Sequence, residues 1–300
     1  MSGGVDWVAA DWGTSNLRVW LMDAADRPLR RLESDRGMGA LSREEFAPTL
    51  AALLAPHLDG RRLPVVICGM AGSRQGWAEA PYAAAPCRPP TLSQGTRVSA
   101  GDAPLDAVIL PGVRQADPPD VMRGEETQVA GVLAAEPGFD GAILLPGTHS
   151  KWVRVSVGEI VAFRTFMTGE LFALLSERSV LRHSVAAEGW DEAAFLSGVE
   201  AGMARPEAVA ADLFGLRAAA LIADLGPQAA RARLSGLLIG AELRAARGWR
   251  LGLDLRIVGA EGVGRAYAAA LAAEGAAPRL LPAEETTLAG LAAARRESPR

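Results

Sequence analysis

The chain has 300 residues, of which 49% are hydrophobic and 22% are charged, and its formal net charge is -4. This composition predicts a globular protein with a sizeable core, and it excludes a disordered chain and a strongly basic nucleic-acid-binding surface. No apolar run reaches the roughly 18 residues of a membrane span, and the start of the chain has no signal-peptide pattern. We therefore expect neither a nucleic-acid partner nor a membrane partner.

The cysteines and histidines argue against a metal site built from these residue types. Cys68 and Cys87 have no metal-ligand spacing, and the three histidines are scattered along the chain. Two cysteines in apolar and proline-rich surroundings are typical of a reduced compartment, so we expect a cytoplasmic protein.

The first half of the chain predicts strands, turns and two helices. Strands are expected at 8–10, at 17–22 and within 23–34, followed by an amphipathic helix at 43–58 and a buried strand at 65–68. The Pro- and Gly-rich segment 81–104 predicts irregular structure rather than a core element. A strand at 108–110 and a helix at 124–135 follow. Residues 136–141 are the predicted boundary between a first domain, 1–137, and a second domain, 138–300.

The second half begins with a strand, a small polar turn and a second strand, and then a hairpin, all within 142–166. The remainder is rich in Ala and Leu and predicts mainly helices. One late strand, 253–258, leads into the glycine-rich residues 259–262. A last helix is expected at 283–295, and it is a candidate to pack back toward the first domain.

Two polar turns, half a chain apart, form an internal repeat. Gly13-Thr14 and Gly147-Thr148 each follow an apolar strand and precede a strand that contains Trp and a basic residue. Glycine lets a ligand approach the backbone closely, and backbone N–H groups with hydroxyls form an anion site. The repeat predicts two turns that face each other across a cleft and hold a polyphosphate.

Only the first turn carries an acid, because Asp11 aligns with Leu145. A carboxylate beside a phosphate site would repel the phosphate unless a cation lies between them. Mg²⁺ is bound in this way, through one or two carboxylates together with substrate phosphates and water. We therefore predict that Asp11 positions Mg²⁺ while residues 13–15 contact the terminal phosphates of a nucleotide.

These features resemble the ATPase superfamily of actin, hexokinase and Hsp70. The two turns are similar to its two phosphate motifs, IVGAEG at 257–262 to its adenosine motif, and the helices at 124–135 and near 286–291 to its two connecting helices. More narrowly, DWGTSNLR, GMAGSRQGW, VMRGEETQ, PGTHSKWV, RTFMTGEL and LSGLLIGAE together resemble the 2-dehydro-3-deoxygalactonokinase family. The six motifs occur in that family's order and span nearly the whole chain.

The resemblance implies a two-domain, duplicated α/β fold of the actin-like ATPase (ribonuclease H-like) type with a central nucleotide cleft. It also implies transfer of a phosphoryl group from ATP, with Mg²⁺, to the 6-hydroxyl of 2-dehydro-3-deoxy-D-galactonate in galactonate catabolism. The first domain is expected to bind the sugar and the second the nucleotide. The nucleotide-binding candidates are Asp11, Gly13, Thr14, Ser15, Arg18, Gly147, Thr148, Gly259, Ala260 and Gly262.

The base of the reaction is open in the sequence. Many sugar kinases of the superfamily use an aspartate, but PGTHSKW contains none. Glu125 and Glu126 are the candidates because they open a helix expected to border the cleft. Adjacent helical residues point about 100° apart, so we do not expect both to reach one hydroxyl. Acids in a first helical turn also complement the helix dipole, and this structural role is the alternative.

Several residues are candidates to bind the sugar acid. Arg123 or Lys151 is expected to bind the carboxylate, and Arg123 is preferred because of its acidic neighbours. Gly72 and Ser73 are expected to line the sugar pocket, with Trp77 and Tyr82 as its walls, although both aromatics also suit a core. The remaining candidates are His149, Thr168 and Glu170, each with a structural alternative as a packed side chain or a helix cap.

Other functions fit less well or stay open. The order of glycines at 259–264 reverses the dinucleotide fingerprint and comes too late in the chain for a dehydrogenase, and no Walker A sequence exists. A non-catalytic sugar-acid sensor and a kinase for the gluconate-derived epimer remain alternatives, because stereochemistry at one carbon depends on hydrogen bonds in the pocket. A homo-oligomer is also left open.

Overall fold

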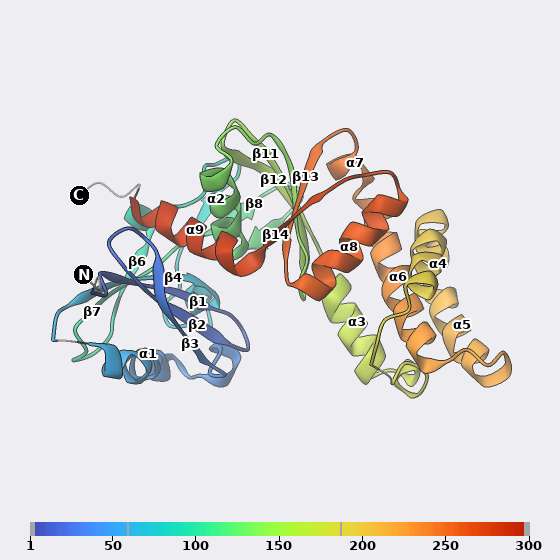
Figure 1. Cartoon of the computed structure of the whole chain (residues 1–300), viewed down its shortest axis with the longest axis horizontal. Helices are drawn as coiled ribbons and strands as arrows, with labels where there is room; N and C mark the ends of the chain where they lie inside the picture. Colours follow the sequence, from blue (N-terminus) through green and yellow to red (C-terminus); the bar gives the residue numbers. More distant parts are fainter. Residues whose placement is uncertain (1–3, 59, 187, 297–300) are drawn as a thin grey trace. The chain divides into compact units, whose positions relative to one another are not determined.

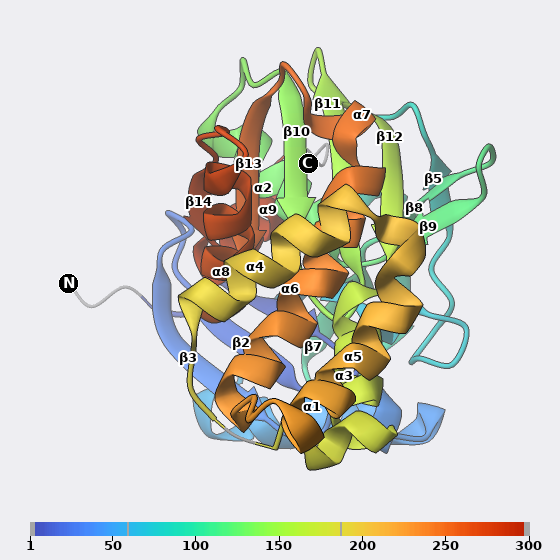
Figure 2. The same ribbon diagram turned by 90° about the vertical axis from the view of Figure 1, so that its right-hand side faces the viewer.

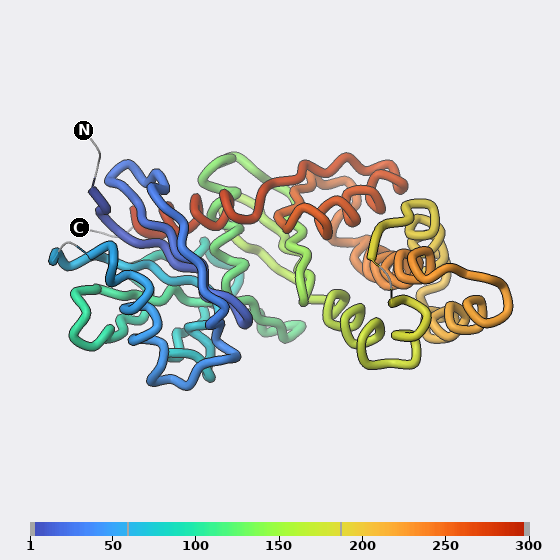
Figure 3. The backbone as a smooth tube through the Cα atoms, turned by 60° about the horizontal axis from the view of Figure 1, so that its bottom comes forward, coloured from blue at the N-terminus to red at the C-terminus, as the bar shows by residue number. Residues whose placement is uncertain are grey.

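The computed structural model describes residues 4–58, 60–186 and 188–296, which form two compact units. Unit 1 consists of the described parts of 1–139, 156–162 and 283–300; unit 2 consists of those of 140–155 and 163–282. The chain trace shows the last segment, in red, returning to the unit formed by the first segment, in blue (Figure 3). Among these described residues, no helix has both the length and the apolar character to cross a membrane.

Unit 1 is built on a six-stranded sheet in the order β3-β2-β1-β4-β7-β6 (Figure 1). β1 pairs antiparallel with β2 and parallel with β4, and β4 pairs parallel with β7. A small second sheet has the order β5-β8-β9. The strands of unit 1 are β1 (Trp7–Trp12), β2 (Leu17–Met22), β3 (Pro28–Ser34), β4 (Leu63–Gly69), β5 (Tyr82–Ala84), β6 (Thr96–Ser99), β7 (Leu105–Ile109), β8 (Gly112–Gln115) and β9 (Asp120–Met122), and its helices are α1 (Phe46–Leu54), α2 (Glu125–Ala135) and α9 (Ala283–Arg296).

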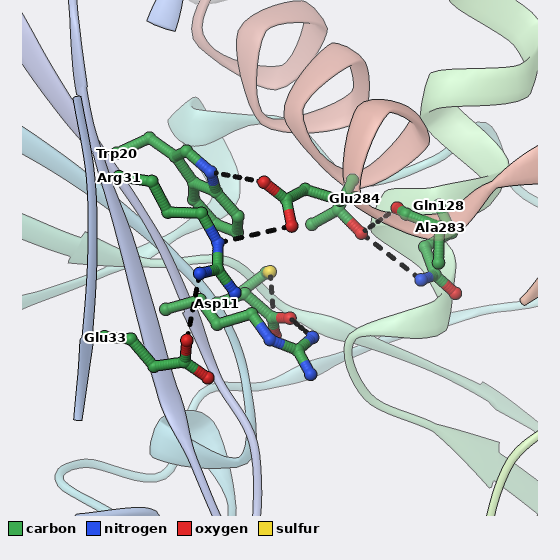
Figure 4. Close-up of polar contacts among 10 residues, drawn as sticks. Asp11, Trp20, Arg31, Glu33, Gln128, Ala283 and Glu284 are labelled. Atoms are coloured by element: carbon green, nitrogen blue, oxygen red, sulfur yellow. Dashed lines mark hydrogen bonds and ion pairs between the residues drawn. The ribbon is translucent and has the colours of Figure 1, made fainter. Parts of the chain in front are cut away.

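The large sheet of unit 1 buries both faces, because apolar side chains of its central strands point alternately to one face and to the other. Trp12 faces α1 and packs against Phe46, with 4.8 Å between the ring centroids. Trp7 and Trp20 lie in the cluster on the other face, where Leu291 of α9 covers them. Glu284 fixes α9 there, since it accepts a hydrogen bond from Trp20 and forms an ion pair with Arg31, on two neighbouring strands (Figure 4). Side chains of successive strand residues point to opposite faces, which explains this division.

The crossing of α2 and α9 depends on glycine. A Cβ atom added at Gly290 would lie 1.8 Å from the carbonyl oxygen of Thr127, and one added at Gly131 would lie 1.9 Å from that of Thr286. Only glycine allows two helix backbones to approach this closely. The last helix is therefore an integral part of unit 1.

Unit 2 repeats the strand order of unit 1. Its sheet runs β12-β11-β10-β13-β14, with β10 antiparallel to β11 and parallel to β13, which is parallel to β14. Helices α4 and α5 both pack against α6 (Figure 2). The strands of this sheet are β10 (Gly141–Leu145), β11 (Ser150–Ser156), β12 (Glu159–Phe166), of which unit 2 holds the part from Phe163 on, β13 (Asp254–Gly259) and β14 (Arg279–Pro282). The helices of unit 2 are α3 (Thr168–Glu177), α4 (Glu192–Ala204), α5 (Val209–Ile222), α6 (Pro227–Ala245), α7 (Arg247–Arg250) and α8 (Glu261–Ala273).

The prediction of a duplicated α/β fold of the actin-like type is confirmed by this repeated order of strands. In both sheets the first two strands pair antiparallel, the third strand lies beside the second, and the first strand pairs parallel with the fourth. The prediction that 81–104 contains no core element is wrong. Within it, β6 pairs antiparallel with β7 and completes the large sheet, because Val98 supplies an apolar contact despite the surrounding Pro and Gly residues. The nucleotide cleft predicted from the two turns stays a prediction.

Candidate functional site

The first polar turn lies at the carboxyl end of β1 in unit 1. Its Gly13 N–H donates to the carbonyl oxygen of Asn16 at 2.9 Å, and the exposed Thr14 and Ser15 form its tip. Residues 37–39 support it from outside, since Met38 N–H donates to Gly13 O at 3.0 Å and Gly39 N–H to Thr14 O at 2.9 Å. This backing segment was not predicted, although two glycines in three residues were a signal for close backbone packing.

Asp11 stands beside this turn and is partly buried, with 25% of its side chain exposed. Arg18, directly opposite it on β2, comes within 3.5 Å of Oδ2, and Cys68 Sγ donates to Oδ1 at 3.8 Å (Figure 4). Burial raises the pKa of Asp11, and the positive charge of Arg18 partly opposes that rise. The sequence left two roles open for Arg18, binding a phosphate or pairing with an acid. Its contact with Asp11 favours the second role.

Two further carboxylates lie near Asp11 at the start of α2. Gly124 has a φ of 106°, and a Cβ on it would lie 3.3 Å from Gly69 Cα at the end of β4. Glu125 is partly exposed and accepts a hydrogen bond from Arg123 N–H at 2.9 Å. Glu126 is only 2% exposed and accepts from Gly124 N–H and from the Thr127 hydroxyl. Burial, followed by the charge of Glu125, raises the pKa of Glu126 to about 8.

Arg123 is a buried cation with unused donors. It is 9% exposed, and its Nη2 donates to Ala80 O at 2.8 Å while its guanidinium lies 4.2 Å from the ring centroid of Tyr82. Among the described residues, its Nε and Nη1 have no hydrogen-bond partner, and neither has the buried hydroxyl of Ser73. A Cβ on Gly72 would lie 2.7 Å from Arg123 Nη1. The structure therefore brings together four predicted sugar-acid residues: Gly72, Ser73, Tyr82 and Arg123.

Trp77 lies elsewhere in unit 1. It is 7% exposed and belongs to the hydrophobic core, where its ring centroid is 6.0 Å from that of Trp12 and 6.2 Å from that of Phe46. These contacts favour the core role that the sequence left open for this residue.

The second polar turn lies at the carboxyl end of β10 in unit 2. Gly147 and Thr148 are exposed, and α3 packs directly on them: a Cβ at Gly169 would lie 2.2 Å from Gly147 O, and Glu170 N–H donates to Thr148 O at 2.8 Å. His149 Nε2 lies 2.5 Å from Glu170 Oε2 in an exposed pair. The turn and the first turn of α3 therefore form one rigid polar surface.

The predicted adenosine motif adjoins this surface within unit 2. A Cβ on Gly259 would lie 2.8 Å from Cγ of Pro146, so this glycine allows the polar turn to pack on β13. Ala260 is exposed, and Gly262 borders open space. Lys151 is buried on β11, directly opposite Leu145, as Arg18 is opposite Asp11.

A cavity of about 350 Å³ joins these elements of unit 2. Its size lies in the range of about 300–1,000 Å³ typical of small-molecule sites. Its small and polar lining residues are Gly147, Thr168, Gly169, Ser235, Gly262 and Tyr267. Its apolar walls are Phe172, Trp190, Leu238, Ile239, Val263 and Ala266.

A carboxylate in the predicted helical run, Glu242, lies beneath this cavity and was not predicted as a site residue. It is 3% exposed and accepts hydrogen bonds from Trp152, Thr168 and Tyr267. Thr168, expected at the sugar acid, is thus held by Glu242 at the cavity. An acid at the end of the otherwise uncharged run 235–241 was the signal available in the sequence.

No group of three or more Cys, His, Asp or Glu side chains among the described residues is arranged to hold a metal ion. Asp11 nevertheless fits the way in which Mg²⁺ is bound in nucleotide sites, where one or two carboxylates suffice and substrate phosphates and water complete the shell. Its side chain is partly exposed, although each of its oxygens also has a protein partner.

The comparisons with known proteins agree with one another. Residues 11–294 match the family model described as 2-keto-3-deoxy-galactonokinase. The chain is 39% identical over 298 residues to the "Probable 2-dehydro-3-deoxygalactonokinase DgoK1" of Rhizobium meliloti, covering 97% of this chain and 96% of that protein. It is 37% identical over 243 residues to the 2-dehydro-3-deoxygalactonokinase of Escherichia coli, covering 80% of each. A crystal structure of a Sinorhizobium meliloti protein that bears the same activity name superposes with a TM-score of 0.90 at 38% identity, covering 96% of this chain and 97% of that one.

Proposed function

The chain belongs to the 2-keto-3-deoxy-galactonokinase family, and we propose that it transfers a phosphoryl group from ATP to the 6-hydroxyl of 2-dehydro-3-deoxy-D-galactonate. This reaction yields the 6-phosphate and ADP and serves galactonate catabolism. In this proposal unit 1 binds the sugar acid and unit 2 binds the nucleoside and phosphates. The free cysteines Cys68 and Cys87 support a cytoplasmic location.

The main support for a substrate with a carboxylate group is the incomplete hydrogen bonding of the buried Arg123 side chain. A buried guanidinium with two unpartnered donors is costly unless a ligand completes its hydrogen bonds. The buried Ser73 hydroxyl, next in the chain to Gly72, is also unpartnered among the described residues. A carboxylate is a ligand group that accepts hydrogen bonds from a guanidinium, and the stacking on Tyr82 fixes the plane of the guanidinium. A neutral sugar would leave the charge of Arg123 uncompensated.

Asp11 is the residue that would hold Mg²⁺. The ion supplies neutralisation of the charge that accumulates on the transferred phosphoryl group. In this proposal the exposed hydroxyls and the N–H groups of Thr14 and Ser15 contact phosphate oxygens, with Gly13 shaping their turn, and Gly147 and Thr148 in unit 2 contact phosphate oxygens too. The roles of His149, Lys151 and Glu170 as contacts to the sugar acid or phosphates stay predictions.

Glu125 is the better of the two candidate bases. Its carboxylate is partly exposed, so a substrate hydroxyl can approach it, and Oε2 accepts a hydrogen bond from the Arg123 N–H. Glu126 is enclosed, and a pKa of about 8 keeps it mostly protonated at neutral pH. We expect Glu125→Gln to lower kcat by about 100-fold or more, because general-base catalysis contributes about 10²–10⁴. Glu126→Gln is the matched variant; equal, mild losses from both would remove both as the base.

The experiment that tests the function is a panel of keto-deoxy sugar acids incubated with ATP and Mg²⁺. Product is scored by mass and by the position phosphorylated. We expect ADP formation that depends on the sugar acid, with the galactonate-derived compound phosphorylated at its 6-hydroxyl. A preference for the gluconate-derived epimer would correct the stereochemistry, and binding without ADP formation would identify a sensor instead.

A further inference from the structure

The buried carboxylate of Glu242 organises one end of the unit 2 cavity. Trp152 Nε1 donates to Oε1 at 2.8 Å, and the hydroxyls of Thr168 and Tyr267 both donate to Oε2, that of Tyr267 at 2.6 Å. Ser150 Oγ lies 2.9 Å from the Tyr267 hydroxyl. These residues come from β11, α3, α6 and α8, so a single side chain connects the four elements around the cavity.

The chemistry of these donors fixes the direction of each hydrogen bond. An indole N–H only donates, and an ionised carboxylate only accepts. Burial raises the pKa of Glu242, but the hydrogen bonds from Thr168, Tyr267 and Trp152 favour its charged form. With its proton committed to Glu242, the Thr168 hydroxyl has only lone pairs left for a ligand, and Thr168 is one of the residues that line the cavity. It is therefore an acceptor toward a ligand, whereas a phosphate or carboxylate oxygen needs a donor.

The rest of the cavity indicates which part of a ligand it holds. Among the described residues that line it, none carries a charged side chain, so it suits an uncharged group with apolar faces. Thr168 is adjacent to Gly169, which packs on the Gly147 carbonyl of the phosphate turn. The ligand group beside Thr168 is thus the one nearest the phosphates, and in a nucleotide this group is the ribose.

We propose that the Thr168 hydroxyl, oriented by Glu242, accepts a hydrogen bond from a ribose hydroxyl of the bound nucleotide, and that Glu242 is the positioning residue for this contact. The inference rests on the proposed function, because it takes ATP as the ligand of unit 2. It adds a recognition step that the motifs alone do not assign. The exocyclic amino group of adenine is the other donor that the same lone pairs could accept, so the test includes both.

Direct nucleotide binding provides the test. Titration calorimetry in Mg²⁺ without sugar acid compares four ligands: ATP, its 2′-deoxy and 3′-deoxy analogues, and purine riboside triphosphate, which lacks the amino group. We expect one deoxy analogue to bind about tenfold more weakly than ATP, the effect of one lost hydrogen bond. The affinity of purine riboside triphosphate relative to that of ATP should be the same in the unmodified protein and in Thr168→Val.

Variants of the network identify the acceptor. Thr168→Val removes the hydroxyl at nearly constant volume and should bring the ratio of ATP to deoxy-analogue affinity to within about twofold of one, whereas Thr168→Ser should keep it. In Glu242→Gln the amide oxygen must face the Trp152 N–H, which can only donate, so the amide N–H₂ faces the Thr168 and Tyr267 hydroxyls. The Thr168 proton is then no longer directed at residue 242, and the ratio should also fall. Thr287→Val, a buried threonine of unit 1 that donates to Ala283 O, is the matched control and should leave the ratio unchanged.

The ratio of ATP to deoxy-analogue affinity distinguishes a loss of positioning from a loss of folded protein. Both affinities are measured on the same preparation, so a smaller folded fraction changes them equally. Equal affinity of the unmodified protein for all four nucleotides would overturn the proposal, as would a ratio that survives in Thr168→Val. If purine riboside triphosphate bound more weakly than ATP to the unmodified protein but not to Thr168→Val, the contact would be to the amino group of adenine. That result would also overturn the proposal. Failure of the kinase function itself would appear separately, as nucleotide binding without sugar-acid-dependent ADP formation.

Discussion

Replacing Arg123 by Met tests the carboxylate site most directly. Methionine keeps an unbranched stem of similar length, which can still lie against Tyr82, but it removes the charge and all five N–H donors. Because Arg123 leaves Nε and Nη1 unpartnered, a bound carboxylate gains up to two charge-assisted hydrogen bonds of about 1.5–3 kcal/mol each. At about 1.4 kcal/mol per tenfold, their loss lowers kcat/KM for the sugar acid by about 100-fold or more.

The assay is steady-state phosphorylation at saturating ATP, with the sugar acid and with its carboxamide. The unmodified protein should prefer the acid strongly, and Arg123→Met should lose most of that preference, with the change mainly in KM for the sugar acid. Its melting temperature should change little, because relief of the desolvation of a buried charge opposes the loss of the hydrogen bond to Ala80 O. Arg74→Met, at an arginine whose side chain is 81% exposed, is the matched control. A KM within threefold of the unmodified value, or an unchanged acid-to-amide preference, would refute the reasoning.

Three further predictions follow from the same structure. Asp11→Asn should abolish turnover without lowering the melting temperature, and activity that persists at ordinary Mg²⁺ would contradict the metal assignment. Glu126 has a pKa of about 8 in the folded chain, against an ordinary value of 4.5. Between these values the unfolded chain binds fewer protons, so stability falls as pH rises, by up to about 1.4 kcal/mol per pH unit. Urea unfolding at pH 5.5, 6.5 and 7.5 should show a shallower fall for Glu126→Gln, and parallel curves would argue against the raised pKa. Gly290→Ala should cost about 1–3 kcal/mol in urea unfolding because its Cβ meets Thr127 O, whereas Gly138→Ala, with open space around it, should cost little; equal costs would show that α2 and α9 separate easily.

The identities of the polar residues were available in the sequence, but the choice between their alternative roles was not. Arg18 and Trp77 each had a binding and a structural interpretation, and the contacts to Asp11 and to the Trp12–Phe46 cluster favour the structural ones. Glu125 and Glu126 are adjacent and chemically identical. Their environments differ because only Glu126 turns into the interior.

The sequence by itself determined the repeat. The same local pattern, a strand, a turn with Gly-Thr and a second strand, occurs in both halves of the chain. It also determined the main strands and helices, because hydrophobic periodicity is a local property. Only the tertiary structure decided that β6 joins the large sheet, that Arg123 keeps unused donors and that Glu242 orients Thr168. These facts depend on residues far apart in the chain, and burial and hydrogen-bond partners exist only once those residues meet.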